Sequence, residues 1–266
     1  MAPVTNLPAE VHAVAPDRPF AWLVLGWRDL LRAPAPGLLH GFVFLCAALG
    51  ILWVGWGRGD LLAGAFSGFL LIAPALCSGM YETSRRLARG EQPRLAEVLS
   101  VWVRGGPPMI GLGLLLAGLG TFWVAASALM VLVAMQVSLS TGATSGSLGS
   151  VSVFLNGFVL SPDHWSFLLW LLAGGIMAAV VFAVGVVSMP LMLDRKVGLR
   201  AAMLTSVRVV GRNPATMALW ALIVMVLTAV AIATGGLLIV FVPLLGHASW
   251  HAYSETVDSA SLPPRT

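Results

Sequence analysis

Long, unbroken apolar runs are the feature of this sequence that most restricts how it can fold. Each is about 20 residues long, which is the length an α-helix needs to cross the hydrocarbon core of a bilayer. Hydrophobic residues make up 58% of the chain and charged residues only 10%, whereas a soluble domain carries about a quarter charged residues. Strands of a membrane barrel would instead alternate in polarity over about ten residues. The sequence therefore predicts an all-α, polytopic membrane protein and excludes a soluble enzyme, a disordered chain and a nucleic-acid-binding module.

Six of these runs are long enough to be transmembrane helices, and together they predict a membrane domain over 18–253. Residues 1–17 are polar and lack the pattern of a cleavable signal sequence, so we expect a disordered cytoplasmic N-terminus. Residues 254–266 are expected to form a cytoplasmic tail. The predicted spans cover about 36–56, 61–81, 108–134, 165–193, 214–233 and 237–253.

Basic residues are divided very unevenly between the two ends of these spans. Of the 15 lysines and arginines, only Arg58 lies in a segment on the outer side, and all the others lie in segments that share the inner side. Short loops rich in lysine and arginine remain cytoplasmic. We therefore expect both termini in the cytoplasm. The positive net charge then reflects topology, with attraction to anionic lipid headgroups as a secondary effect.

A weak internal repeat precedes three of the spans. Two arginines four residues apart, followed two residues later by a proline, occur at 28–34 and again at 208–214, and 102–107 is a looser copy. Each even-numbered span also contains a proline (Pro74, Pro190 and Pro243). We interpret this pattern as three helical hairpins, each preceded by an amphipathic helix that lies in the headgroup region. Chance similarity of apolar segments, and short helices that pack on protein, are the alternatives.

The segment 138–164 contains no basic residue and is rich in serine, glycine and threonine. This composition is typical of a flexible loop. Within it, 151–160 is an apolar patch that either lies on the outer membrane surface or dips back into the bilayer. A plain loop is the preferred interpretation.

Three histidines are the candidate metal-binding residues. His247 and His251 lie four residues apart and share one helical face, and His40 is expected at the same membrane level. Two imidazoles on one face suit a metal or haem site, but no neighbouring Cys, Asp or Glu completes a ligand set. An interfacial histidine pair that reaches the headgroups is therefore preferred. Since the chain also lacks known catalytic motifs, we expect no catalytic residues, no cofactor and no enzymatic activity.

Two further patterns predict local packing. The segments 37–41 and 64–68 fit the GxxxG pattern, which lets helix backbones approach closely. Glu82 precedes Arg85 and Arg86 by three and four residues, the spacing of salt bridges along a helix. These bridges are expected to fix the end of the second span at the membrane surface.

The segments DRPFAWLVLGWRDL at 17–30 and GMYETSRRL at 79–87 resemble a family of proteobacterial integral membrane proteins catalogued as a domain of unknown function. The resemblance extends over about 16–253. It implies a multi-span protein of the bacterial inner membrane. It carries no activity, substrate or site residues with it.

These observations favour an accessory or assembly factor that acts through helix and lipid contacts. Its expected partners are membrane lipid and another integral membrane protein. No nucleic-acid partner is expected. A small-solute permease is the alternative, since proline-broken helices can free backbone carbonyls for a substrate. Metal or haem handling by the three histidines is the third interpretation.

Overall fold

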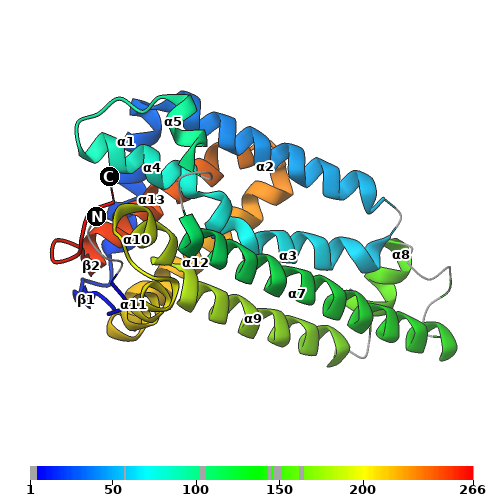
Figure 1. Cartoon of the computed structure of the whole chain (residues 1–266). Coiled ribbons are helices and arrows are strands. Elements are labelled where there is room, and N and C mark those ends of the chain that lie inside the picture. The colour runs from blue at the N-terminus through cyan, green and yellow to red at the C-terminus, as the bar shows by residue number, and fades with distance from the viewer. Residues whose placement is uncertain are drawn as a thin grey trace. The chain divides into compact units, whose positions relative to one another are not determined.

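The computed structural model of the chain describes residues 5–56, 58–101, 106–142, 145, 151–161 and 165–265. Figure 1 shows that most of these residues are helical. The helices are α1 (Arg18–Arg32), α2 (Pro34–Val54), α3 (Gly59–Leu76), α4 (Ser78–Ala88), α5 (Leu95–Leu99), α7 (Gly106–Ser140), α8 (Val151–Phe154), η1 (Leu155–Val159), α9 (Trp165–Gly185), α10 (Ser188–Asp194), α11 (Leu199–Arg212), α12 (Pro214–Thr234) and α13 (Leu238–Thr256).

Five helical segments among the described residues are long and apolar enough to cross a membrane. They are Pro34–Val54, Gly64–Ala88, Gly106–Ser140, Trp165–Asp194 and Pro214–Thr234. The expected all-α polytopic membrane fold is confirmed. The sixth predicted span, 237–253, forms the helix α13 but is not among the five. The second half of α13 contains His247, Ser249 and His251, which lower its hydropathy, so a count of six spans is not confirmed.

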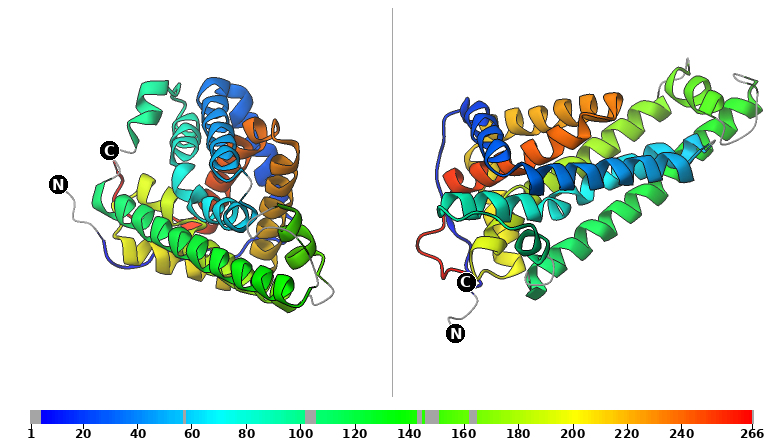
Figure 2. Two further views of the ribbon diagram at one scale, coloured as in Figure 1. Left: turned by 90° about the vertical axis from the view of Figure 1, so that its right-hand side faces the viewer. Right: turned by 90° about the horizontal axis from the view of Figure 1, so that it is seen from above.

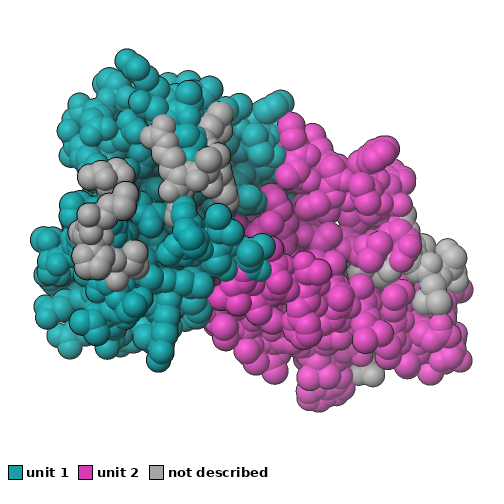
Figure 3. Space-filling model, in the orientation of Figure 1, with its two compact units in different colours: residues 1–45, 74–114, 182–266 teal, residues 46–73, 115–181 magenta. Residues whose placement is uncertain are grey.

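The chain divides into two compact units (Figure 3). Unit 1 comprises residues 1–45, 74–114 and 182–266, and unit 2 comprises residues 46–73 and 115–181. Unit 1 therefore combines the two ends of the sequence with one central stretch.

In unit 1, α1 packs along α13, and α4 also contacts α13. Gly26 permits the close approach of α1, because a Cβ placed there would lie 2.7 Å from the backbone nitrogen of Ala248. Trp22 of α1 meets Trp220 of α12 edge to face, with 5.7 Å between ring centroids, a favourable arrangement for aromatic rings. α12 and α13 run side by side in both views of Figure 2 and are joined by a short turn at Gly235.

Two copies of the sequence repeat form the same local structure. α1 ends at Arg32 and α2 begins at Pro34, and the single residue between them, Ala33, has φ −136° and ψ 67°. α11 and α12 are joined in the same way by Asn213, with φ −128° and ψ 54°. Proline begins each following helix because its missing N–H costs nothing in the first turn. In the third copy, residues 102–105 lie outside the described part of the chain.

The helix α1 has features of both interpretations of the segment before the first span, a helix in the headgroup region and a helix packed on protein. One face, which includes Trp22, Gly26 and Leu30, is buried against protein. The opposite face leaves a stripe of large apolar side chains exposed, at Phe20, Val24, Trp27 and Leu31. α1 is thus packed on protein while keeping an apolar surface free for a membrane.

The terminal segments of unit 1 are bound to each other. Glu10–Val11 (β1) pairs antiparallel with Val257–Asp258 (β2). We expected residues 1–17 to be disordered. In the structure, residues 5–15 are instead held by hydrogen bonds from Ala9 to Thr205 Oγ1 (2.9 Å) and from Val14 to Asn213 Oδ1 (2.8 Å). Residues 1–4 lie outside the described residues.

In unit 2, two indole–hydroxyl hydrogen bonds join the apolar helices. Trp123 of α7 donates to Ser67 Oγ of α3, and Trp170 of α9 donates to Ser127 Oγ of α7, each at 2.6 Å. A polar group in an apolar interior must find a partner, so these four side chains satisfy one another while they connect three helices.

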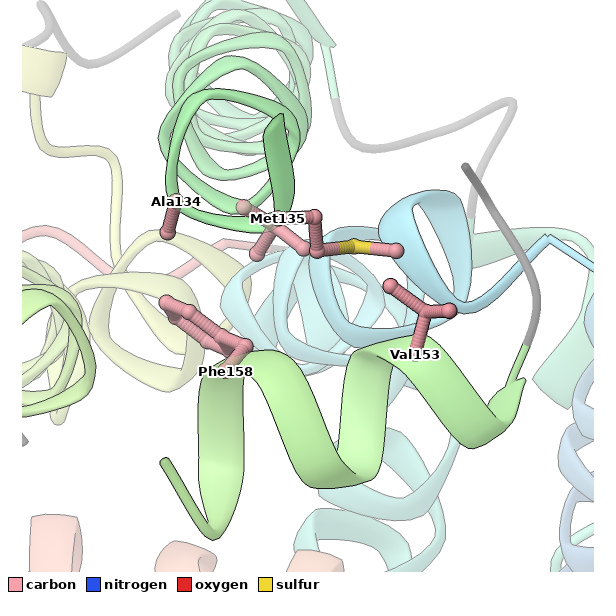
Figure 4. Packing of buried hydrophobic residues seen from close by; sticks show 5 residues of the cluster. Ala134, Met135, Val153 and Phe158 are labelled. Atoms are coloured by element: carbon pink, nitrogen blue, oxygen red, sulfur yellow. The ribbon is translucent and has the colours of Figure 1, made fainter. Parts of the chain in front are cut away.

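The patch 151–160 is helical, which corrects the expectation of a plain loop. It forms α8 and the single π-turn η1, and Val153 and Phe158 are buried against Ala134 and Met135 of α7 (Figure 4). Ser138 donates a 2.6 Å hydrogen bond to the carbonyl of Gly157. The apolar residues of this patch therefore cover the end of α7 within unit 2.

Candidate functional site

A buried polar cluster lies in unit 1, where α1, α4 and α13 meet. Asp29 comes from α1, Ser84 from α4, and His247 and His251 from α13. Ser84 Oγ lies 2.7 Å from Asp29 Oδ2 and 2.8 Å from His247 Nδ1. His251 Nε2 lies 2.8 Å from the same Asp29 oxygen. We call these four residues the Asp29 cluster.

The ionised carboxylate of Asp29 determines the direction of each hydrogen bond in this cluster. Burial alone would raise the pKa of Asp29, but hydrogen bonds from His251 and Ser84 keep it below its ordinary value. A carboxylate can only accept, so Ser84 and His251 both donate to it. The Ser84 oxygen then accepts a hydrogen bond from His247 Nδ1–H.

This arrangement leaves the Nε2 atom of His247 without a proton. In a neutral imidazole that donates from Nδ1, Nε2 carries a free lone pair. His247 is 0% exposed. Among the described residues, its Nε2 and Ser78 Oγ are the buried side-chain polar atoms that have no hydrogen-bond partner. Such an atom calls for an explanation, since nearly all buried polar groups in folded proteins are paired.

His40 of α2 has the same tautomer for a different reason. Its Nδ1 lies 2.8 Å from the carbonyl oxygen of Pro36, one turn earlier in the helix, and a carbonyl can only accept. Its Nε2 is therefore also unprotonated when the ring is neutral. It faces Gly79 of α4, where the absence of a side chain makes room for the ring.

The structure brings the three histidine candidates into the same region but gives them different partners. His247 and His251 both belong to the Asp29 cluster, and His40 is close enough to His247 for the two to interact electrostatically. Among the described residues, no three or more His, Cys, Asp or Glu side chains are arranged to hold a metal ion. A conventional tetrahedral site is thus not formed by this part of the chain.

The Asp29 cluster contains the residue types of a serine hydrolase triad in a different order. In a triad, histidine lies between serine and the carboxylate and takes the serine proton. Here Ser84 lies between His247 and Asp29, so its proton already points to the carboxylate. The cluster holds an imidazole in a fixed tautomer and does not activate the serine oxygen.

Charged side chains surround the same end of unit 1. Glu82 accepts from Arg85 and Arg86, each at 2.7 Å, which confirms the salt bridges expected from the spacing. Arg86 also reaches Glu97 at 2.8 Å. Asp194 binds Arg195 at 2.9 Å and accepts a hydrogen bond from the Tyr253 hydroxyl at 3.0 Å. These networks connect α4, α5, α10 and α13.

Sequence reasoning missed two members of the cluster, Asp29 and Ser84. Asp29 lies 222 residues from its partner His251, and Ser84 lies 163 residues from His247. A signal was present, because both residues belong to the segments 17–30 and 79–87 that carry the family resemblance.

Comparison with known families gives one match. A family described as "Predicted integral membrane protein (DUF2189)" matches residues 61–194, half of the chain. The chain belongs to this family. The matched segment includes Ser84, whereas Asp29, His247 and His251 lie outside it. Neither a curated protein nor a solved structure matches the chain.

Proposed function

We propose that this protein is an accessory or assembly factor of the bacterial inner membrane, and that it acts through contacts with lipid and with another integral membrane protein. The observation that carries the proposal is the exposed surface of α9. In the segment Trp165–Asp194, only 6% of the most apolar window is buried by the chain itself, against 50% for Gly64–Ala88. A helix that its own chain covers so little must be surrounded by lipid or by other helices.

The exposed residues of α9 are large and apolar over most of its length. Gly175 lies among these residues, and the space beside it is empty, since no atom lies within 4 Å of a Cβ placed there. An open glycine among leucines offers a shallow notch into which a partner helix can pack. The exposed apolar residues are Trp165, Leu168, Leu169, Leu171, Leu172, Ile176 and Val180.

The two GxxxG segments do not provide this partner surface. A Cβ at Gly41 would overlap the backbone of Ile239 in unit 1. In unit 2, a Cβ at Gly68 would lie 3.0 Å from the carbonyl oxygen of Gly120. Both glycines already pack against helices of the same chain, so α9 and not a GxxxG segment is the proposed partner surface.

The lipid part of the proposal is supported by α1. Its exposed apolar stripe (Phe20, Val24, Trp27 and Leu31) lies beside the exposed residues Arg28 and Arg32. An apolar stripe next to arginines is typical of a helix in the headgroup region, where the guanidinium groups reach lipid phosphates.

The test is affinity purification of the full chain from native membranes in mild detergent, with mass spectrometry of what remains bound. We expect one integral membrane protein in stoichiometric amount. Gly175→Leu, which fills the notch on α9, should release it without unfolding the chain. Gly118→Leu is the matched control, because Gly118 of α7 is equally open and should leave the partner bound. A wild-type protein that purifies without a partner would overturn the proposal and favour transport, to be measured by solute uptake into proteoliposomes.

A further inference from the structure

Two stretches of unit 1 present the same surface 180 residues apart. They are 21–40 and 201–220, and every exposed position of the first is exposed again in the second. In each stretch a helix ends, one buried residue turns the chain, and a helix long enough to cross a membrane begins. The repeat found in the sequence therefore extends to the part of each copy that the chain leaves uncovered.

Each copy exposes a pair of arginines on the helix before the turn. Arg28 and Arg32 of α1 correspond to Arg208 and Arg212 of α11, and all four are exposed. Residues four apart are neighbours on a helix surface, so each pair presents two guanidinium groups together. Among the described residues, none of the four takes part in an ion pair. Other arginines of unit 1 are ion-paired, among them Arg18, Arg85, Arg86, Arg89 and Arg195.

No carboxylate of the repeat shares the exposed face of either pair. Asp29 is the one acidic residue in the two stretches, and it points into the interior, where Ser84 and His251 donate hydrogen bonds to it. The corresponding residue of the second copy is the buried Val209. Each pair therefore presents two positive charges that the repeat itself does not neutralise.

The second arginine of each pair lies two residues before a membrane span. Pro34 and Pro214 begin α2 and α12, which are both long and apolar enough to cross a bilayer. Arg32 and Arg212 are therefore expected at the level of the lipid headgroups, where each span leaves the hydrocarbon. Large apolar side chains are exposed beside the arginines, namely Val24 and Trp27 on α1 and Leu204 and Val207 on α11.

We propose that each arginine pair binds the phosphate of one anionic phospholipid, so that the chain holds two such lipids, one on α1 and one on α11. This inference rests on the lipid part of the proposed function and names the class of lipid. Guanidinium groups bind phosphate oxygens through paired, charge-assisted hydrogen bonds. The apolar side chains of the same helix face then contact the acyl chains of the bound lipid.

The charge of each pair selects between lipid classes. A zwitterionic headgroup also carries a phosphate, but its own ammonium group cancels that charge and is repelled by the two arginines. A lipid with a net negative charge brings no such cation and is attracted to a basic segment at the membrane surface. Anionic phospholipid is therefore the occupant that fits both the charge and the position of the repeat.

Native mass spectrometry of the full chain in detergent, titrated with phosphatidylglycerol or phosphatidylcholine, tests this inference. We expect the wild-type chain to bind two phosphatidylglycerols, each more tightly than phosphatidylcholine. Arg28→Gln with Arg32→Gln should weaken one of the two by about 30-fold, as loss of two basic contacts to an anionic headgroup does. Arg208→Gln with Arg212→Gln should weaken the other equally.

Arg89→Gln with Arg94→Gln is the matched control. Both arginines are exposed and lie outside the repeat, so this variant loses the same charge and should keep both lipids. An equal loss of lipid in the control would overturn the inference, because it would reduce the effect to net charge. Displacement of the lipid by an equal concentration of inorganic phosphate would also overturn it, since the arginines would then bind a free anion.

The wild-type titration gives a result that does not depend on how the variants fold. Equal affinity for the two lipids would overturn the inference, and retention of neither lipid would overturn the lipid part of the proposed function as well. Loss of a co-purified membrane protein in the arginine variants, with lipid binding unchanged, would assign this surface to a protein. Release of a partner by Gly175→Leu is measured separately on α9, so failure of the partner proposal and failure of this inference are distinguishable.

Discussion

Asp29 is the residue on which the polar interior of unit 1 depends. Its Oδ2 atom accepts hydrogen bonds from both Ser84 and His251, so one carboxylate connects three helices. The network then continues from Ser84 to His247. A change at this position affects every member, whereas a change at the exposed Arg28 next to it affects none of them.

Replacement Asp29→Asn tests this dependence. The amide oxygen can take the place of Oδ2 as the acceptor but carries no charge, so the hydrogen bonds from Ser84 and His251 both lose their charge assistance. We expect a loss of about 2 kcal/mol in the free energy of unfolding, measured by thermal unfolding in detergent. Asp17→Asn is the control, since Asp17 is exposed and its side chain does not cap α1. Equal stability of the two variants would contradict the role given to Asp29.

The pH dependence of this contribution follows from the lowered pKa of Asp29. The folded state favours the ionised carboxylate, so its pKa lies below the ordinary value of 3.8. Its stabilisation is therefore fully present above that value and is lost as the pH falls through the pKa of the folded state. The difference in unfolding free energy between wild type and Asp29→Asn should be constant near neutral pH and shrink below pH 3.8. A difference that stayed constant into this acidic range would contradict the lowered pKa.

Contacts between residues close in sequence could be predicted, and contacts between distant residues could not. The bridges from Glu82 to Arg85 and Arg86 follow from helical spacing alone and are present. The same spacing places His247 and His251 on one face. It cannot reveal that Asp29 lies opposite them, because that contact depends on how α1 packs on α13.

At the scale of whole elements, backbone atoms and not side chains set how closely α1 and α13 can approach each other. Gly26 lies against Ala248 and Leu244 so closely that a methyl group would come within 3 Å of two backbone atoms. Backbone cannot rotate away as a side chain can. The two helices would have to separate, and the Asp29 cluster would open with them.

Gly26→Ala should therefore destabilise unit 1 by about 2 kcal/mol or more, as overpacking does in closely packed interiors. The expected result is a lower melting temperature in detergent, together with faster hydrogen exchange at α1 and α13. Gly118→Ala is the matched control: Gly118 has open space around it, and alanine is the better helix former by about 1 kcal/mol. Equal melting temperatures of the two variants would contradict the close packing at Gly26.

The positions of the long apolar helices were predictable from apolar runs, but the breaks between α3 and α4 and between α9 and α10, and the α8–η1 cap of unit 2, were not. Its apolar run is too short to predict a span, and its neighbours are rich in glycine and serine, so composition favoured a loop. Only the burial of Phe158 and Val153 on α7 makes the segment helical, and that surface is formed by tertiary packing.

Phe158→Ala tests the cap. Phe158 is 1% exposed and meets Phe167 edge to face at 5.7 Å, so its removal leaves a cavity that costs about 3 kcal/mol. Phe122→Ala is the control, because Phe122 of α7 is exposed. We expect limited proteolysis to cleave the segment 151–161 faster in the Phe158 variant alone. Equal cleavage in both variants would show that this packing does not hold the cap.

At the scale of the molecule, the pairing of β1 with β2 restricts the topology. One strand precedes the first span and the other follows α13, so we expect these two segments to lie on the same side of the membrane. A chain that starts and finishes on one side crosses an even number of times. This favours α13 as a sixth crossing, although its polar second half makes it less apolar than the other five.

Cysteine labelling in intact cells tests this topology. In a background with Cys46→Ala and Cys77→Ala, Ser145→Cys is expected to react with a membrane-impermeant maleimide, because 138–164 is predicted to lie outside. Glu91→Cys and Ser259→Cys should react only after the cells are opened. Labelling of Ser259→Cys in intact cells would place the C-terminus outside and contradict an even number of crossings with a cytoplasmic start.

The pairing of the two ends also sets an order on biosynthesis. Residues 5–15 and α1 are synthesised well before the residues and elements that they contact, which are Thr205, Asn213, α13 and β2. Contacts so distant in sequence form late. The face of α1 that packs on α13 therefore stays uncovered until α13 has been synthesised. A chain released before residue 238 would lack α13, so the contacts of α1 and α4 with that helix could not form.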